Sequence, residues 1–273
     1  MISDRHPEFG TGGRVLADDL KLELSELNPN TRERSEFVFT EGGHWEKNRG
    51  PSQTRRFAEF FHQNIRIPWA SFSVLDVGCA LGDSLPVWHE KYPLAELHGC
   101  DVAEKAVKRC QERYGGFARF FRASFEEIQG FWDVIYCSNV LEHFEQYIDI
   151  AEALLLRCKV LFVLTPFGEL GDGSPLKPNG EYYHVATLYR DSFDALVRED
   201  KASRIETLIK GCPGAWGLTR VQKIRWLAGL ALRKRYIPQE PLQVLYAIHN
   251  KAWSTPDFLF NQRAVGDEPR SLC

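Results

Sequence analysis

The chain has 273 residues, 44% of them hydrophobic, and is therefore long enough to bury one large core. Its formal net charge of −3 is close to balance, which disfavours a general nucleic-acid binder, because such a protein carries a strong basic field. Its seven cysteines include no CxxC pair, which argues against a structural zinc site.

The cysteines lie mostly in apolar runs, where a free thiol behaves as a small buried hydrophobe and indicates a reducing compartment. The first residues form no apolar h-region, and no segment reaches the roughly 18 to 20 apolar residues that a bilayer span requires. We therefore expect a soluble, cytoplasmic protein without a membrane span. No cluster in the sequence indicates a catalytic metal, and we expect none.

Residues 1–50 are rich in Glu, Arg, Gly and Asn without a sustained period, which predicts a partly ordered lead-in. The end of this segment, 37–45, places aromatic residues beside a glycine pair. Two interpretations stay open for it: a segment that covers a site, or a surface loop with one buried Trp.

From residue 51 the chain alternates between helical and extended patterns. Phe57, Phe60 and Phe61 recur at helical spacing and predict a helix over 51–63, with Ser52 as its cap. Further elements are expected as strands at 73–77, 96–100, 118–122, 134–137 and 160–164, and as helices after Gly82 and over 103–114 and 147–157. This alternation predicts an α/β fold with a Rossmann-like, doubly wound sheet.

The C-terminal part predicts a helix at 192–198 and strands at 204–209 and 242–248. We expect one domain over 51–255 and a tail over 256–273. Within the domain, 168–190 has the composition of a substrate loop, and 212–240 reads as a helical insertion. Its basic amphipathic stretch, 218–236, indicates either an ordinary surface helix or a peripheral contact with an anionic surface.

A glycine-rich turn follows the first predicted strand. Asp76 stands near the strand end, and Gly78 and Gly82 leave room for a ligand at the carboxyl edge of the sheet. The dinucleotide fingerprint GxGxxG would need glycines where the chain has Ala80 and Asp83, which disfavours an NAD-dependent enzyme.

This turn resembles the first glycine motif of class I S-adenosyl-methionine-dependent methyltransferases, with Ala80 in place of the middle glycine. A second match is the run 132–144, which resembles the family's signature after the fourth strand, including its Leu-Glu-His. Segments 159–166 and 182–187 resemble the fifth strand and the histidine-containing segment after it. The resemblance implies seven strands in a mostly parallel sheet, an antiparallel last strand at 242–248, and S-adenosyl-methionine as cofactor.

The expected nucleotide contacts lie after the first three strands. Asp101, 23 residues after Gly78, has the spacing of a carboxylate that binds ribose hydroxyls, although it also fits a helix N-cap. By resemblance, Ser124 faces the adenine, and Phe125 offers a stacking surface. The cofactor contacts expected in full are Asp76, Gly78, Cys79, Gly82, Asp101, Val102, Ser124, Phe125, Cys137 and Ser138.

The resemblance places Cys137 and Ser138 beside the methionine moiety and Asn139 toward the substrate. Methyl transfer to a hydroxyl needs a group that removes its proton, and histidine titrates near neutral pH. His143 and His184 are therefore the candidate catalytic residues, with Glu142 as an alternative base or as a residue that orients a histidine.

We expect methyl transfer to a small molecule, with a hydroxyl of a saccharide or polysaccharide precursor as the first hypothesis. Methylation of a quinone, a lipid or another metabolite is the alternative among enzymes. A non-catalytic protein that binds S-adenosyl-methionine and serves as a partner is another, suggested by Ala80 and Ser124. The fold alone does not select among these acceptors.

Overall fold

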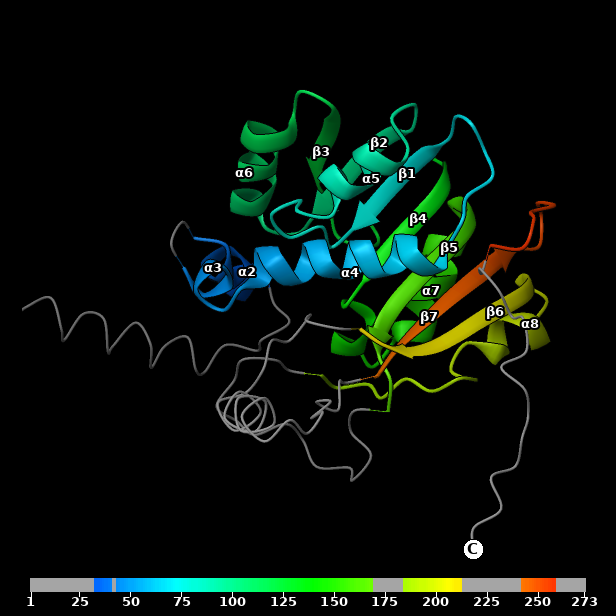
Figure 1. Cartoon of the computed structure of the whole chain (residues 1–273). Helices are drawn as coiled ribbons and strands as arrows, with labels where there is room; N and C mark the ends of the chain where they lie inside the picture. The colour runs from blue at the N-terminus through cyan, green and yellow to red at the C-terminus, as the bar shows by residue number, and fades with distance from the viewer. Residues whose placement is uncertain (1–31, 41–42, 169–183, 213–241, 259–273) are drawn as a thin grey trace, which may run out of the picture.

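The computed structural model describes residues 32–40, 43–168, 184–212 and 242–258. Their central feature is one seven-stranded sheet with the strand order β3-β2-β1-β4-β5-β7-β6 (Figure 1). The strands are β1 (Ser73–Val77), β2 (Glu96–Asp101), β3 (Ala118–Arg122), β4 (Trp132–Ser138), β5 (Cys158–Pro166), β6 (Ala202–Gly211) and β7 (Leu242–Asn250). Only β7 runs against its neighbours β5 and β6, so the predicted fold class is confirmed.

Helices cover both faces of this sheet. They are α2 (Arg32–Val38), α3 (His44–Lys47), α4 (Gly50–Asn64), α5 (Leu85–Lys91), α6 (Glu104–Tyr114), α7 (Tyr147–Leu155) and α8 (Asp194–Arg198), with a 3-10 turn, η1 (Leu141–His143). In Figure 1, α4 and α5 lie on one face and α7 on the other. None of the described helices is long and apolar enough to cross a bilayer.

The strands alternate their side chains between two apolar cores, as a sheet covered on both faces requires. In β4, Val134 and Tyr136 belong to the core under α4 and α5, whereas Ile135 and Cys137 belong to the core under α7. The six cysteines among the described residues are buried and free, as the apolar patterns predicted.

The predicted cap of α4 was wrong. The helix begins at Gly50, and its N-cap is Arg49 in a left-handed conformation (φ 67°), so Ser52 lies inside the first turn. Pro51 sits at the start of the helix, where its missing N–H costs no hydrogen bond. The N-cap of α6 is Ala103 rather than Asp101.

Two further predicted boundaries concern the C-terminal end of the domain and its insertions. Phe258 falls in the predicted tail but is buried against Phe162, so the packed chain extends beyond residue 255. The basic stretch 218–236, almost all of the predicted insertion 212–240 and most of the loop 168–190 lie outside the described residues.

The short helices α2 and α3 dock on α6. The Glu36 carboxylate accepts hydrogen bonds from the backbone N–H groups of Glu104 (2.5 Å) and Lys105 (3.1 Å), in the first turn of α6. Carboxylates are favourable there because the first N–H groups of a helix have no partner within it. Arg109 of α6 adds an ion pair with Glu46 at 2.6 Å. The sequence pattern did not predict these helices.

Replacing Glu36 by Ala should loosen α2 from α6. Loss of a carboxylate from a helix N-terminus costs about 1 kcal/mol, which corresponds to a roughly fivefold rise in the undocked population. We expect trypsin to cleave after Arg32, Arg34 or Lys47 about fivefold faster than in the parent chain. Glu59→Ala, which removes a carboxylate paired only within α4, is the control and should leave this rate unchanged. Equal cleavage of both variants would show that Glu36 does not hold the docked helices.

Candidate functional site

A cavity of about 470 Å³ opens at the carboxyl ends of β1, β2, β3 and β4. Its floor is made by the turns that follow these strands, and α2, α3 and the start of α4 close it from the side. The binding sites of doubly wound folds lie in this place, where the order of the strands reverses between β1 and β4.

Ten of the predicted site residues line this cavity: Asp76, Gly78, Cys79, Asp101, Val102, Ser124, Phe125, Ser138, His143 and His184. Gly82 and Cys137 do not line it. A Cβ on Gly82 would lie 3.1 Å from Cys110 Sγ, so this glycine allows close packing of the turn on α6. The Cys137 side chain is buried in the core under α7.

The turn after β1 keeps the backbone of a glycine motif. Gly78 and Gly82 have φ angles of +71° and +76°, and a Cβ on Gly78 would lie 2.6 Å from Val140 Cγ2. Ala80 also adopts a left-handed conformation, with φ at 51°. Its side chain packs in the small core that contains Phe39.

The Asp101 carboxylate organises this turn. Its Oδ2 accepts from the backbone N–H of Ala80 at 3.0 Å, and its Oδ1 accepts from that of Ala103 at 2.9 Å. Burial raises the pKa of Asp101 to about 6, although the hydrogen bonds from Ala103 and Ala80 act in the opposite direction. Asp101 therefore presents a desolvated carboxylate to the cavity.

The second buried carboxylate is Asp76. Burial raises its pKa to about 7, a hydrogen bond from the Ser84 hydroxyl lowers it, and the charge of Asp101 raises it further. Two nearby carboxylates in a desolvated site are favourable only where a ligand supplies positive charge or hydrogen-bond donors. This end of the cavity is thus suited to a ligand that carries both positive charge and hydrogen-bond donors.

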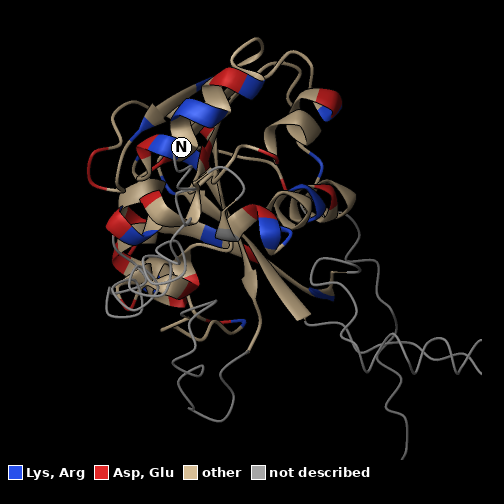
Figure 2. Cartoon of the chain, turned by 90° about the vertical axis from the view of Figure 1, so that its left-hand side faces the viewer, with Lys and Arg blue, Asp and Glu red and all other residues tan. Residues whose placement is uncertain are grey.

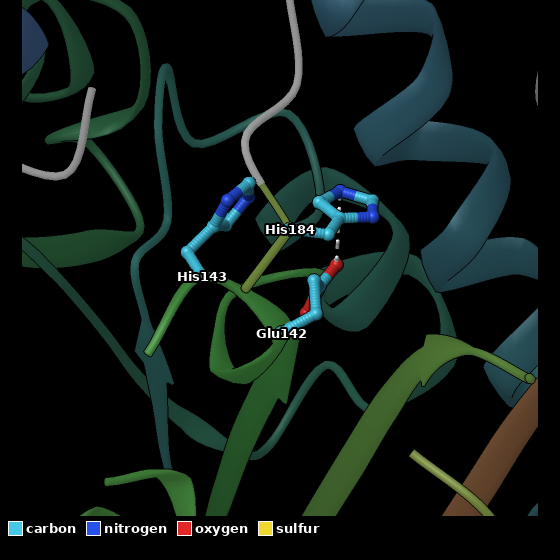
Figure 3. A group of neighbouring side chains, drawn as sticks. All are labelled: Glu142, His143 and His184. Carbon is cyan, nitrogen blue, oxygen red and sulfur yellow. Dashed lines mark ion pairs between the residues drawn. The ribbon is translucent and has the colours of Figure 1, made fainter. Parts of the chain in front are cut away.

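The third group comprises Glu142, His143 and His184 (Figure 3). Glu142 Oε2 accepts from the Thr165 hydroxyl at 3.0 Å, while Oε1 has no hydrogen-bond partner among the described residues and lies 4.0 Å from His184 Nε2. The His143 and His184 rings meet edge to face, with centroids 4.9 Å apart. The main-chain carbonyl of Glu142 accepts from Val185 and Ala186, which ties the segment after His184 to η1.

Sequence reasoning named none of the cavity residues that precede the glycine turn as site residues, although it left open that 37–45 covers a site. The described N-terminal segment and α4 contribute Arg32, Arg34, Ser35, Val38, Phe39, Trp45, Asn48, Gln53, Thr54 and Phe57. Their aromatic content at 37–45 was the only signal, and it was equally compatible with a surface loop. Ser84 and Thr165 were also missed, because a lone hydroxyl residue carries no pattern that pairs it with a distant carboxylate.

Charged residues of both signs are interspersed on the described helices around this end of the molecule (Figure 2). Arg32 pairs with Glu127 and Arg113 with Glu46, so basic side chains near the cavity have acidic neighbours. The described residues on this side therefore carry charges of both signs.

Residues 75–163 match a family model described as a methyltransferase domain. The structure is similar to that of the plantazolicin methyltransferase BpumL in complex with SAH, with 17% identity, a TM-score of 0.50, and coverage of 87% of this chain and all of the other. It is also similar to the plantazolicin methyltransferase BamL in complex with SAH and a triazolic desmethylPZN analog, with 15% identity, a TM-score of 0.51, and coverage of 87% and 99%. A comparison with curated protein sequences gave no match. Residues 75–163 therefore resemble a methyltransferase domain in sequence, and the chain has the same fold as these two methyltransferases.

Asp76→Asn should stabilise the protein without ligand, and the gain should grow with pH. The folded-state pKa of about 7 exceeds the ordinary value of 3.8, so folding loses stability from Asp76 as pH rises between these values. Asn does not ionise and avoids this loss, which is at most about 4 kcal/mol at 1.36 kcal/mol per pKa unit. Urea unfolding at pH 4, 6 and 8 measures the difference from the parent chain. A difference that stays constant with pH would contradict a raised Asp76 pKa.

Proposed function

We propose that this chain transfers the methyl group of S-adenosyl-methionine to a small-molecule acceptor, and that the acceptor atom is a hydroxyl oxygen. The observation that carries the proposal is the pairing of a glycine turn and buried Asp101 with a polar cluster, Glu142, His143 and His184, in one cavity. SAH, which is bound in both similar structures, is the product that S-adenosyl-methionine leaves after methyl transfer.

The cofactor is assigned to the end of the cavity that β1, β2 and β3 form. Asp101 would accept hydrogen bonds from the ribose hydroxyls, while Val102, Ser124 and Phe125 would surround the adenine. The Ser124 N–H donates to Glu127 Oε2 at 2.9 Å, and the Ser124 hydroxyl, which also interacts with Glu127, is the group proposed for the adenine.

The methionine end of the cofactor is assigned to the turns after β1 and β4. It carries an ammonium group and a sulfonium, and the buried carboxylate of Asp76 is complementary to this positive charge. Gly78, Cys79 and Ser138 line the same part of the cavity. Cys137 would contribute through its backbone only, since its side chain is in the core.

The acceptor is assigned to the part of the cavity near η1. Glu142 Oε1 and Asn139 Oδ1 are buried hydrogen-bond acceptors for which the described residues supply no donor. An acceptor that carries several hydroxyls would satisfy both atoms, and this favours a saccharide over a quinone or a lipid tail. The left-handed conformation of Ala80 supports cofactor binding, because the glycine motif favours the same backbone conformation.

Methyl transfer itself is an in-line displacement. The hydroxyl oxygen attacks the methyl carbon, the carbon–sulfur bond breaks with its electron pair on sulfur, and the hydroxyl proton must leave. His143 and His184 lie together in the cavity and are the proposed catalytic residues, and Glu142 would orient the imidazole of His184.

Calorimetric titration with S-adenosyl-methionine and, separately, with NAD tests the cofactor assignment. We expect saturable binding of S-adenosyl-methionine alone. Asp101→Ala should weaken it at least 100-fold, because two hydrogen bonds to a charged acceptor contribute about 1.5–3 kcal/mol each. Glu104→Ala, which removes a neighbouring exposed carboxylate, is the control and should bind normally. Unaltered binding by a folded Asp101→Ala variant would remove the assignment.

His143→Ala and His184→Ala test the acceptor end. General acid–base catalysis contributes typically about 10²- to 10⁴-fold, so we expect a fall in kcat of this size in at least one variant, with cofactor affinity within about twofold of the parent. The readout is radioactive methyl transfer to a panel of saccharides and phenolic metabolites. Normal turnover by both variants would exclude the two histidines from catalysis.

A further inference from the structure

Glu142, His143 and His184 form the group of potential metal ligands that stands out among the described residues. Each offers one ligand atom, and these three atoms all lie within 4.8 Å of one another. Figure 3 shows the three side chains extending toward a common space from η1 and from the start of the segment at His184. Two imidazoles and one carboxylate are a set that first-row transition ions bind.

The Glu142 carboxylate indicates that the space between these three side chains is suited to a bound cation. Its side chain is only 2% exposed, and Oε1 has no hydrogen-bond partner in the part of the chain that the structure describes. A buried carboxylate oxygen without a donor is unfavourable, and a cation would satisfy it. The Oε1 to His184 Nε2 separation of 4.0 Å is too long for a hydrogen bond but lies within the span of two metal–ligand bonds of about 2.1 Å each.

The surroundings hold the three ligands in place. Thr165 donates to the other oxygen of Glu142 at 3.0 Å, which leaves Oε1 directed at the histidines. The Glu142 carbonyl accepts from Val185 at 2.8 Å and from Ala186 at 3.0 Å, so the segment that carries His184 is fixed to the turn that carries His143. Such hydrogen bonds around a ligand set support metal affinity because they reduce the reorganisation needed on binding.

We propose that Glu142, His143 and His184 bind one divalent first-row transition ion, of the class of Zn²⁺, Co²⁺ and Mn²⁺. Three protein ligands leave coordination positions open toward the cavity that these residues line. The sequence led us to expect no metal. His184 lies 41 residues beyond His143, and this separation matches no recognised spacing of metal ligands, so the sequence did not indicate the site.

The role of the ion rests on the proposed methyl transfer. The acceptor hydroxyl binds at an open position, and the ion lowers the pKa of the hydroxyl so that its proton passes to water. The oxygen then attacks the methyl carbon, and the carbon–sulfur bond breaks with its electron pair on sulfur. With the ion bound, both imidazoles are ligands, and the ion replaces a free histidine as the group that activates the hydroxyl.

Titration of the full chain with Co²⁺ tests the site directly, because visible absorption reports Co²⁺ coordination without any turnover. We expect one Co²⁺ per chain and competition by Zn²⁺. His143→Gln, His184→Gln and Glu142→Gln should each weaken binding at least tenfold. His89→Gln and Glu90→Gln, on α5 and outside the cavity lining, are the matched controls and should bind as the parent does.

Two results would overturn the proposal: no Co²⁺ binding by the parent chain, or equal binding by the parent and the three ligand variants. Because Glu142 is buried, its replacement could disturb the fold. Circular dichroism and titration with S-adenosyl-methionine therefore check that each variant is folded. His143 is only partly buried and provides the variant least expected to disturb the fold. If the parent chain binds S-adenosyl-methionine but not Co²⁺, the metal site is excluded and the proposed methyl transfer is unaffected. If the parent chain does not bind S-adenosyl-methionine, the proposed function itself is excluded.

Discussion

Two buried carboxylates impose the main constraint on this molecule. Asp76 is 3% exposed and Asp101 7%, at the edge of the sheet where the strand order reverses. Ser84 and the N–H groups of Ala80 and Ala103 stabilise them, but burial still raises both pKa values. Folding therefore builds a site that is electrostatically incomplete until a ligand with donors and positive charge enters it. The glycine turn, with its left-handed residues, is what brings the backbone close enough for both carboxylates to face one cavity.

The N-terminal helices complete this site from outside the sheet. They dock on α6 through Glu36 and Glu46, and their apolar residues, Val38, Phe39 and Trp45, line the cavity. The same helix, α6, begins at Glu104, three residues after Asp101. The residues proposed to bind the cofactor and the covering helices thus contact the same helix, so ligand binding and docking of α2 and α3 are expected to stabilise each other.

The acceptor end differs in character from the cofactor end. Its polar groups come from η1 and from the segment that starts at His184, and they include a buried carboxylate oxygen without a donor. This arrangement suits either proton removal from a hydroxyl or coordination of a cation, and both serve a methyl transfer that must lose a proton. The fold would accept many acceptors, so specificity depends on these few side chains.

Local patterns in the sequence were sufficient to predict the elements and to name ten of the residues that line the cavity. The alternation of apolar strands and helices predicted the sheet, because burial on both faces gives each βαβ unit a short-range signature. The turn from Asp76 to Gly82 and the spacing to Asp101 indicated the site, since both motifs follow strands that end at the same edge. Boundaries erred where backbone geometry outweighs residue preference, as at Arg49, whose left-handed conformation starts α4 in place of the predicted cap at Ser52.

Contacts between distant residues were decided only by the tertiary structure. Glu36 caps a helix that begins 68 residues later, Thr165 fixes Glu142 across 23 residues, and His184 reaches Glu142 from beyond β5. No periodicity or spacing encodes such pairs, because they form when the sheet brings the ends of separate elements together. The sequence by itself determined the class of fold and the cofactor edge of the sheet, whereas the covering helices and the Glu142–His143–His184 cluster arise from packing between elements.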